Sequence, residues 1–353
     1  MDIYPIVQIA LANGASDLHL IPSSPPMMRI EGALQPVEGM QPLSADDINQ
    51  ALRQVTSDEE RADFEENLEL DFSRTLRNIG RIRCNASKQR GMTSLALRLV
   101  PSVIPSLSEL GLPEICKELA LKPRGLVVVS GPTGSGKSTT LSAMINYLNG
   151  MERRRVVTIE DPIEYIYSNN HCTITQRELG NDTHSFTQAL KHVLRQDPDV
   201  ILVGEMRDYE TAAAVLTVAE TGHLVLTTGH ATSAAQAVER IIDLFPSHER
   251  SLVQARLASF LIAILCQALV PKAEGPGRVA AVEVMVACPA VRNIIREGKI
   301  YQLPNTMVTQ AQMGMVTLDH ALVKLYKKGV INFDSMLAVC NDPDEVGKLI
   351  TKT

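Results

Sequence analysis

The stretch LVVVSGPTGSGKSTTLSAMINYL, residues 126–148, decides the fold. It joins a short apolar run rich in β-branched residues to a glycine-rich turn and then to a segment of helical character. The turn, residues 131–138, matches GxxxxGK[ST], in which glycines let successive backbone N–H groups surround phosphate oxygens at the amino end of a helix. The motif therefore predicts a site for a nucleoside triphosphate, with Lys137 on the β and γ phosphates and Ser138 as a ligand of Mg²⁺.

The predicted nucleotide-binding residues follow directly from this turn. They are Gly131, Pro132, Thr133, Gly134, Ser135, Gly136, Lys137, Ser138 and Thr139. The alternative is an ordinary glycine-rich turn, which the strand before it and the helix after it disfavour.

Residues 122–288 have one sequence pattern, in which short apolar runs alternate with amphipathic segments. The runs VVTIE, DVILVGE and HLVLTTGH are separated by helical patterns, one of them near residues 186–196. Such alternation is typical of a parallel sheet flanked by helices, so we expect an α/β core. The longest apolar stretch, Leu257 to Val270, is too short to span a bilayer and predicts a buried helix. Residues 289–353 are expected to be largely helical.

Residues 1–100 differ from the rest and predict a small α+β domain. Apolar residues recur at helical spacing before Asn13-Gly14, and SDLHL and MMRIEG indicate two strands. Ser44 and Asp47 have the spacing of a capping box before a helix that runs to about Val55. Residues 79–100 predict two more strands with a turn at residues 89–91, and residues 101–121 form a proline-bearing linker.

Composition narrows the classes of function. A chain of 353 residues allows two to three domains, and 34 basic against 40 acidic residues give a net charge of −6. That charge and the absence of Trp disfavour nucleic-acid binding. The six cysteines lie far apart, which indicates a reducing compartment and no structural zinc site. The amino terminus does not resemble a signal peptide, so we expect a cytosolic chain that reaches membranes only through a partner.

Carboxylates follow two of the predicted strands. Glu205 ends DVILVGE, where it can act as general base on the attacking water. Glu160, Asp161 and Glu164 follow VVTI, and strand ends on one edge of a parallel sheet converge on the ligand. We expect these four acids to reach Mg²⁺ through water or to face the γ-phosphate. The alternative for the last three is capping of a helix.

Histidines and arginines supply further candidates. His230 lies at the carboxyl end of a predicted strand and could sense the γ-phosphate, whereas His223 lies at its other end and suits an interface or relay. His171, His184, His192 and His320 are interpreted as packing or capping residues.

Five arginines could neutralise the transferred phosphoryl group. Arg81, Arg83, Arg98, Arg195 and Arg207 are the candidates. The first two share one face of a strand, and a solvated sheet face is the alternative, although no acidic residue alternates with them in sequence. If the arginine comes from another domain or chain, activity requires assembly.

Together these motifs resemble the type II/IV secretion ATPase superfamily, and within it the PilT-type pilus retraction ATPases. GASDLHL, GRIRCN, KPRGL, TIEDPIEY, ILVGEMRD and AETGHLVLTTGH look like family signatures in family order over essentially the whole chain. The resemblance implies that Glu205 is the catalytic carboxylate, Glu164 the acid of the "Asp box", and His223 and His230 the "His box" pair. AVRNIIRE, residues 290–297, is similar to AIRNLIRE of the retraction branch, and the CxxC zinc module usual in assembly and secretion ATPases is missing. Gly229 and Ala231 flank His230 where the family usually has Leu and Thr.

The resemblance also implies a fold, a reaction and partners. It implies a PAS-like amino-terminal domain, a RecA-like P-loop core over residues 122–288, and a helical carboxyl-terminal part. The expected protein is a cytoplasmic, Mg²⁺-dependent ATPase that forms a homohexamer and retracts type IV pili. Its expected partners are an inner-membrane pilus platform protein and a second retraction ATPase, with no nucleic acid and no direct membrane insertion. The alternatives are a pilus-assembly or type II secretion ATPase, a RecA-like nucleic-acid motor, and a nucleotide switch that does not hydrolyse.

Overall fold

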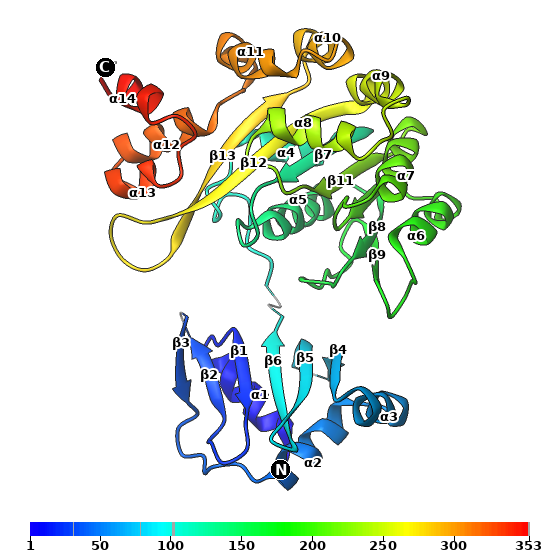
Figure 1. Cartoon of the computed structure of the whole chain (residues 1–353), viewed down its shortest axis with the longest axis vertical. Helices are drawn as coiled ribbons and strands as arrows, with labels where there is room; N and C mark the ends of the chain where they lie inside the picture. The colour runs from blue at the N-terminus through cyan, green and yellow to red at the C-terminus, as the bar shows by residue number, and fades with distance from the viewer. Residues whose placement is uncertain (31, 78, 101–102, 352–353) are drawn as a thin grey trace. The chain divides into compact units, whose positions relative to one another are not determined.

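The chain forms two compact units. The computed structural model describes residues 1–30, 32–77, 79–100 and 103–351, so Pro101 and Ser102 of the predicted linker lie outside it. The first unit comprises Met1–Val103 and Glu164–Ile166, and the second comprises Ile104–Ile163 and Tyr167–Thr353 (Figure 1). Each unit is described by itself.

The first unit is an antiparallel sheet with helices on one face. Its strands are β1 (Asp17–Leu20), β2 (Met27–Ile30), β3 (Ala33–Pro36), β4 (Glu69–Leu76), β5 (Gly80–Gln89) and β6 (Met92–Leu99), in the order β3-β2-β1-β6-β5-β4. Its helices are α1 (Ile3–Ala12), α2 (Ala45–Val55) and α3 (Asp58–Asn67). Burial alternates along β5 and β6, and their inward residues share one core with the apolar faces of the helices.

Local signals explain most of these elements. Ser44 and Asp47 form the predicted capping box of α2, and α1 ends at the predicted Asn13 cap. A second capping box, Ser57 with Glu60, begins α3, which the sequence analysis had missed together with β3 and β4. The predicted α+β character of residues 1–100 is confirmed.

The second unit contains a mixed seven-stranded sheet in the order β13-β12-β7-β11-β10-β8-β9. Its strands are β7 (Gly125–Ser130), β8 (Arg155–Glu160), β9 (Thr173–Glu178), β10 (Val200–Val203), β11 (Leu224–Thr228), β12 (Leu261–Pro271) and β13 (Arg278–Val286). Neighbouring strands are parallel except β12 and β13. Every residue of β7, β10 and β11 is buried, because helices cover both faces of the sheet. The predicted α/β fold is confirmed.

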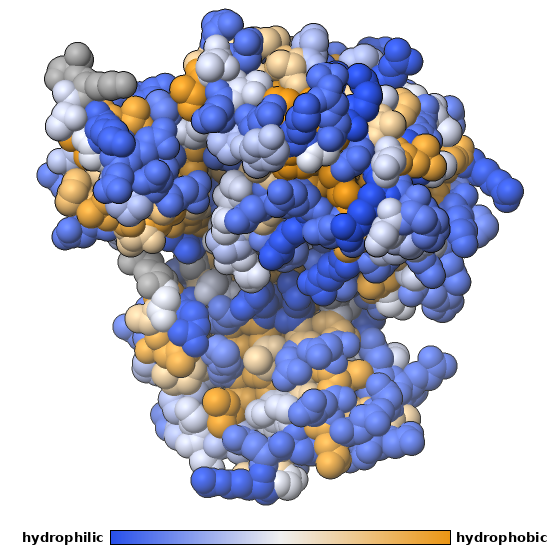
Figure 2. Space-filling model, turned by 45° about the horizontal axis from the view of Figure 1, so that its top comes forward, coloured by the Kyte–Doolittle hydropathy of each residue, from blue (hydrophilic) through white to orange (hydrophobic). Residues whose placement is uncertain are grey.

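Helices divide between the two faces of this sheet. α4 (Ile115–Ala120) and α5 (Lys137–Met151) share one apolar core with it. On the other face lie α6 (Phe186–Val193), α7 (Tyr209–Glu220), α8 (Ala234–Asp243) and α9 (Arg250–Phe260), with the short turn η1 (Leu194–Gln196) after α6. Figure 2 shows mostly hydrophilic residues on the visible face of the upper part of the molecule, with apolar residues scattered among them.

The prediction of one buried helix over residues 257–270 is wrong. Helix α9 ends at Phe260, and β12 begins at Leu261. β12 lies between β7 and β13, so side chains on both of its faces enter a core and the run is apolar without alternation. A continuous apolar run of this length does not distinguish a helix from such a strand.

The carboxyl-terminal residues are helical, as predicted. They form α10 (Pro289–Arg296), η2 (Ile300–Gln302), α11 (Leu303–Thr309), η3 (Ala311–Met313), α12 (Leu318–Lys327), α13 (Phe333–Leu337) and α14 (Pro343–Thr351). Leu318 and Leu322 of α12 pack with Val270 of β12 and Ala281 of β13 in a separate small core. In the described part of the chain, no helix combines the length and apolar character needed to cross a bilayer.

Candidate functional site

The glycine-rich loop lies between β7 and α5, at the carboxyl ends of the parallel strands. Gly131, Gly134 and Gly136 have φ of 143°, 78° and 87°, a region that side chains disfavour. A Cβ on Gly131 would lie 2.3 Å from the carbonyl oxygen of Gln267 on β12. Glycine at position 131 is therefore required by this close approach as well as by its backbone conformation.

The loop presents groups that suit an anion. Gly136 is the N-cap of α5 and offers no side chain to cap the helix, whose amino end carries partial positive charge. Lys137 is 9% exposed and its Nζ donates to the carbonyl oxygens of Gly131 and Pro132, at 2.9 and 3.0 Å. Among the described residues no hydrogen-bond partner is found for the buried hydroxyl of Ser135. Phosphate oxygens would serve this lysine and this hydroxyl better than the loop carbonyls do.

Gln267 supports the loop from the neighbouring strand. Its side-chain oxygen accepts a hydrogen bond from Thr140 Oγ1 of α5 at 2.7 Å, and its backbone contacts Gly131. Sequence reasoning assigned Gln267 no role, although a polar residue inside the apolar run 257–270 was the available signal.

Glu205 lies two residues beyond the end of β10, and its carboxylate lies close to two other predicted site residues. Its Oε1 lies 2.6 Å from Arg207 Nε, and its Oε2 lies 3.6 Å from His230 Nε2. The Glu205 side chain is only 14% exposed. The structure thus brings together the predicted general base, one predicted arginine and the predicted phosphate-sensing histidine.

Hydrogen bonds between strand ends, one from a backbone amide and two from side-chain hydroxyls, hold the segments that carry these residues. The amide of Gly204 donates to the carbonyl of Ile159 at 2.8 Å, which joins β10 to β8. Thr228 Oγ1 at the end of β11 donates to the carbonyl of Gly204. Ser130 Oγ at the end of β7 donates to the carbonyl of Ala231 at 2.7 Å. The loops that carry Glu205, His230 and the phosphate-binding turn are therefore linked through one edge of the sheet.

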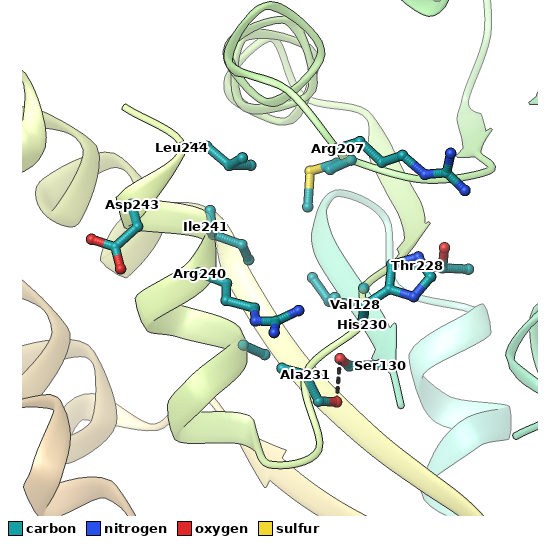
Figure 3. Close-up of a pocket in the computed structure, with 13 residues that line it drawn as sticks. Val128, Ser130, Arg207, Thr228, His230, Ala231, Arg240, Ile241, Asp243 and Leu244 are labelled. Carbon is teal, nitrogen blue, oxygen red and sulfur yellow. Dashed lines mark hydrogen bonds between the residues drawn. The ribbon is translucent and has the colours of Figure 1, made fainter. Parts of the chain in front are cut away.

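A cavity of about 590 Å³ lies beside Glu205's partners, and Figure 3 shows its lining. Val128, Ala231 and Ile241 provide apolar walls, and Arg207 and His230 lie at its border with Glu205. Figure 3 shows Arg240 extending into the cavity and Asp243 pointing away from it. Asp243 forms an ion pair with Arg250 at 3.0 Å. Asp243 is therefore engaged by Arg250, and the cationic Arg240 extends into the cavity.

A second cavity, of about 400 Å³, opens on the other side of the phosphate-binding turn. Pro132, Thr133, Gly134 and Ser135 form one wall of it. Its other walls come from Thr232, from β12 and β13, and from Leu318 of α12. The segment between α13 and α14 contributes Ala338, Val339 and Asn341.

The acids after β8 do not form a metal-binding cluster. Glu160 is buried and accepts hydrogen bonds from Thr158 Oγ1 at 2.6 Å and Gln176 Nε2 at 3.2 Å. Asp161 and Glu164 are exposed, and Glu164 groups with the first unit. The described residues contain no group of three or more His, Cys, Asp or Glu that could hold a metal ion. The metal-related roles of Glu160, Asp161 and Glu164 stay predictions.

His223 and His230 flank opposite ends of β11, so the structure does not bring them together. His223 Nδ1 lies 3.0 Å from Thr221 Oγ1 and 3.2 Å from the carbonyl of Val218, at the end of α7. His320 Nδ1 lies 2.7 Å from Thr317 Oγ1 at the start of α12, which agrees with its interpretation as a capping residue.

Arg98, one of the predicted arginines of the first unit, has an acidic neighbour that the sequence analysis missed. Arg83 and Arg98 are paired across β5 and β6, and Arg98 Nε donates to Asp17 Oδ1 of β1 at 3.1 Å. Burial alone would raise the pKa of Asp17, yet hydrogen bonds from Ser16 and Arg98 bring it below its usual value. Strand pairing supplies this acid from 81 residues away in sequence, so the pattern of residues along β5 alone could not indicate it.

Arg195 is exposed in η1, and Arg81 is the second residue of β5 in the first unit. The phosphate-related roles of Arg81, Arg83, Arg98 and Arg195 remain predictions.

A glycine-rich loop of this geometry, at the carboxyl edge of a parallel sheet, defines a P-loop nucleotide-binding protein. The family model described as "Type II/IV secretion system protein" matches residues 1–332, and the chain belongs to this family. It is 45% identical to the type IV pilus retraction ATPase PilT of Pseudomonas aeruginosa over 332 residues, which cover 94% of this chain and 96% of that protein. It is 42% identical to the type IV pilus ATPase PilU of the same organism, over 99% of this chain and 91% of PilU.

A solved structure agrees with these similarities. The crystal structure of the pilus retraction motor PilT with bound ADP superposes with a TM-score of 0.91 and 42% identity, and covers 99% of both chains. The predicted membership of the type II/IV secretion superfamily and the resemblance to its retraction branch are confirmed.

The packing of Gly131 gives a first prediction. Gly131→Ala places a methyl group against the carbonyl of Gln267, so the loop must move. We expect a loss of about 1–3 kcal/mol in stability and a fall in affinity for a fluorescent ATP analogue of at least about tenfold. Thermal unfolding and fluorescence titration measure the two effects. Gly150→Ala is the control, because no atom lies within 4 Å of its added Cβ. An alanine variant at position 131 with unchanged nucleotide affinity would contradict the role of this contact.

Proposed function

We propose that this chain is an ATP-hydrolysing motor that powers the retraction of type IV pili. The observation that carries the proposal is the grouping of Glu205, Arg207 and His230 on the same sheet edge as the phosphate-binding loop. Similarity to PilT over almost the whole length of both chains supports the retraction branch of the family.

Binding of the phosphates begins at the amino end of α5. Lys137 exchanges the carbonyls of Gly131 and Pro132 for the β and γ phosphates, which are stronger acceptors for a cation. Ser138, in the first turn of α5, would hold Mg²⁺; a single hydroxyl ligand fits this ion, which takes its remaining ligands from phosphates and water. The ion would neutralise charge on the β and γ phosphates. We propose that the cavity of about 400 Å³ receives the nucleoside, because the loop itself forms one of its walls.

Hydrolysis requires a base for the attacking water, and we propose Glu205 for this role. Its carboxylate would accept a proton from that water. Arg207 forms an ion pair with this carboxylate. If the Arg207 side chain moved to the γ-phosphate, Glu205 would be free to act as the base, and the arginine would stabilise the transferred phosphoryl group. His230, 3.6 Å from Glu205, would donate a hydrogen bond to the same phosphate.

Assembly completes the proposal. We propose that the active form is a homohexamer, in which arginines from the first unit of one chain reach the nucleotide of another. The ring would act at the cytoplasmic face of the inner membrane on a pilus platform protein, together with a second retraction ATPase.

The lysine of the loop gives the second prediction. Lys137→Ala removes the charge that reaches the phosphates, and we expect phosphate release from ATP to fall below detection. The control is Lys117→Ala, which breaks only a surface ion pair with Glu114 and should leave the rate unchanged. Turnover by the Lys137 variant at the wild-type rate would reject the P-loop assignment.

The base gives the third prediction. Glu205→Gln keeps the size of the side chain but removes proton acceptance, so the rate of hydrolysis should fall by about 10²–10⁴-fold. Affinity for ATP should stay near that of the wild type, as measured by fluorescence titration. Glu210→Gln, an exposed change on α7, is the matched control. A variant that hydrolyses rapidly would place the base elsewhere.

The biological function gives the fourth prediction. Deletion of the gene should leave cells with extra pili that do not retract, and with no twitching motility. Retraction is scored by imaging labelled pili. Wild-type protein should restore it, and the Glu205→Gln variant should not. A deletion strain without pili would indicate an assembly ATPase, and a strain with normal retraction would overturn the proposal.

A further inference from the structure

A buried carboxylate outside the residues discussed so far joins two helices. Glu283 lies on β13 and is 4% exposed. Its Oε1 accepts a hydrogen bond from the amide of Ala234 at 2.6 Å, and its Oε2 accepts one from the amide of Leu318 at 3.1 Å. Ala234 and Leu318 are the first residues of α8 and α12, which lie 84 positions apart in sequence.

Each amide is one of the groups that a helix cannot satisfy internally. Ser233 and Thr317, the N-caps, accept hydrogen bonds from the amides of Gln236 and His320, whereas Glu283 serves the first amide of each helix. A carboxylate at a helix amino end is also favoured by the helix dipole, and here one carboxylate meets two such ends. Burial raises the pKa of Glu283, and the two amides act against that rise.

The surroundings hold Glu283 firmly. The next residue, Val284, pairs with Val316 through two backbone hydrogen bonds of 2.8 and 3.0 Å, only two positions before Leu318. Glu283 of β13 pairs in register with Cys266 of β12. Cys266 directly precedes Gln267, the residue that contacts the glycine-rich loop. The Glu283 carboxylate therefore reaches both helices from a fixed position on the sheet.

The amino ends of the two helices lie beside the cavity that borders the glycine-rich loop. Leu318 itself lines that cavity, and α8 begins two residues after Thr232, which lines it too. A change in the separation of the two helix ends would thus move Thr232 and Leu318, two residues that line the nucleoside cavity.

We propose that Glu283 is a positioning residue that sets the affinity of the site for ATP, because its two oxygens fix the separation of the amino ends of α8 and α12 and thereby the positions of Thr232 and Leu318, which line the nucleoside cavity. This inference rests on the proposed function, which assigns that cavity to the nucleotide. Glu283 touches no reacting atom in this scheme and acts through Thr232 and Leu318.

The fifth prediction tests this role with two variants of the full-length protein. Glu283→Gln keeps the shape but turns one acceptor oxygen into an NH₂ donor, which faces an amide and breaks one contact. Ala234→Pro leaves the carboxylate intact and removes one donor, at the first helical position where proline is tolerated. For both variants we expect KM for ATP and Kd for a fluorescent ADP analogue to rise about tenfold, which corresponds to about 1.4 kcal/mol, with kcat within about twofold of wild type.

The control is Glu220→Gln, which weakens the ion pair of Glu220 with Arg256 on α7 and α9, away from both cavities. It should change neither KM nor kcat. Thermal unfolding is measured for every variant. Folded Glu283 and Ala234 variants with wild-type KM and Kd would overturn the inference and leave the proposed function intact. Variants that unfold at the assay temperature would also overturn it, in favour of a role in stability alone. Wild-type protein that neither binds nor hydrolyses ATP would overturn the proposed function and this inference with it.

Discussion

The close approach of the phosphate-binding loop to β12 is the constraint on which the site depends. The first residue of the loop, Gly131, lies against the backbone carbonyl of Gln267 on β12. Thr140 of α5 donates a hydrogen bond to the side-chain oxygen of the same glutamine. The loop is thus held by the sheet itself and has little freedom to collapse. The backbone amides of such a loop are preorganised, so the main chain of the loop would not have to rearrange to bind an anion.

Charge at the site is balanced within the protein before any phosphate arrives. Lys137 donates hydrogen bonds to two loop carbonyls. Glu205 forms an ion pair with Arg207, and His230 lies 3.6 Å from its carboxylate. The neutral loop carbonyls form weaker hydrogen bonds with Lys137 than charged phosphate oxygens would. In the proposed function, nucleotide binding would reorganise these pairs and would couple the positions of Glu205 and Arg207 to the γ-phosphate.

The sequence allowed prediction of the elements that depend on local signals. The loop, the buried parallel strands and the first capping box follow from residues close together in the chain, and Glu205 was recognisable from its place after an apolar strand. Contacts between distant residues were out of reach. Asp17 reaches Arg98 through strand pairing, Glu283 reaches Ala234 and Leu318 through the packing of helices on β13, and the apolar run of β12 lacks a period that distinguishes strand from helix.

The arrangement of residues on adjacent strands bears on how a motor of this kind could do work. The phosphate-binding loop, His230 and Glu205 follow β7, β11 and β10, three neighbouring strands whose residues are all buried and whose ends are joined by hydrogen bonds. Such a block resists deformation because any slip between strands would break packing on both of its faces. These three strands are therefore expected to move as one rigid group. Any movement that performs work would then occur in the loops and helices that follow the strands.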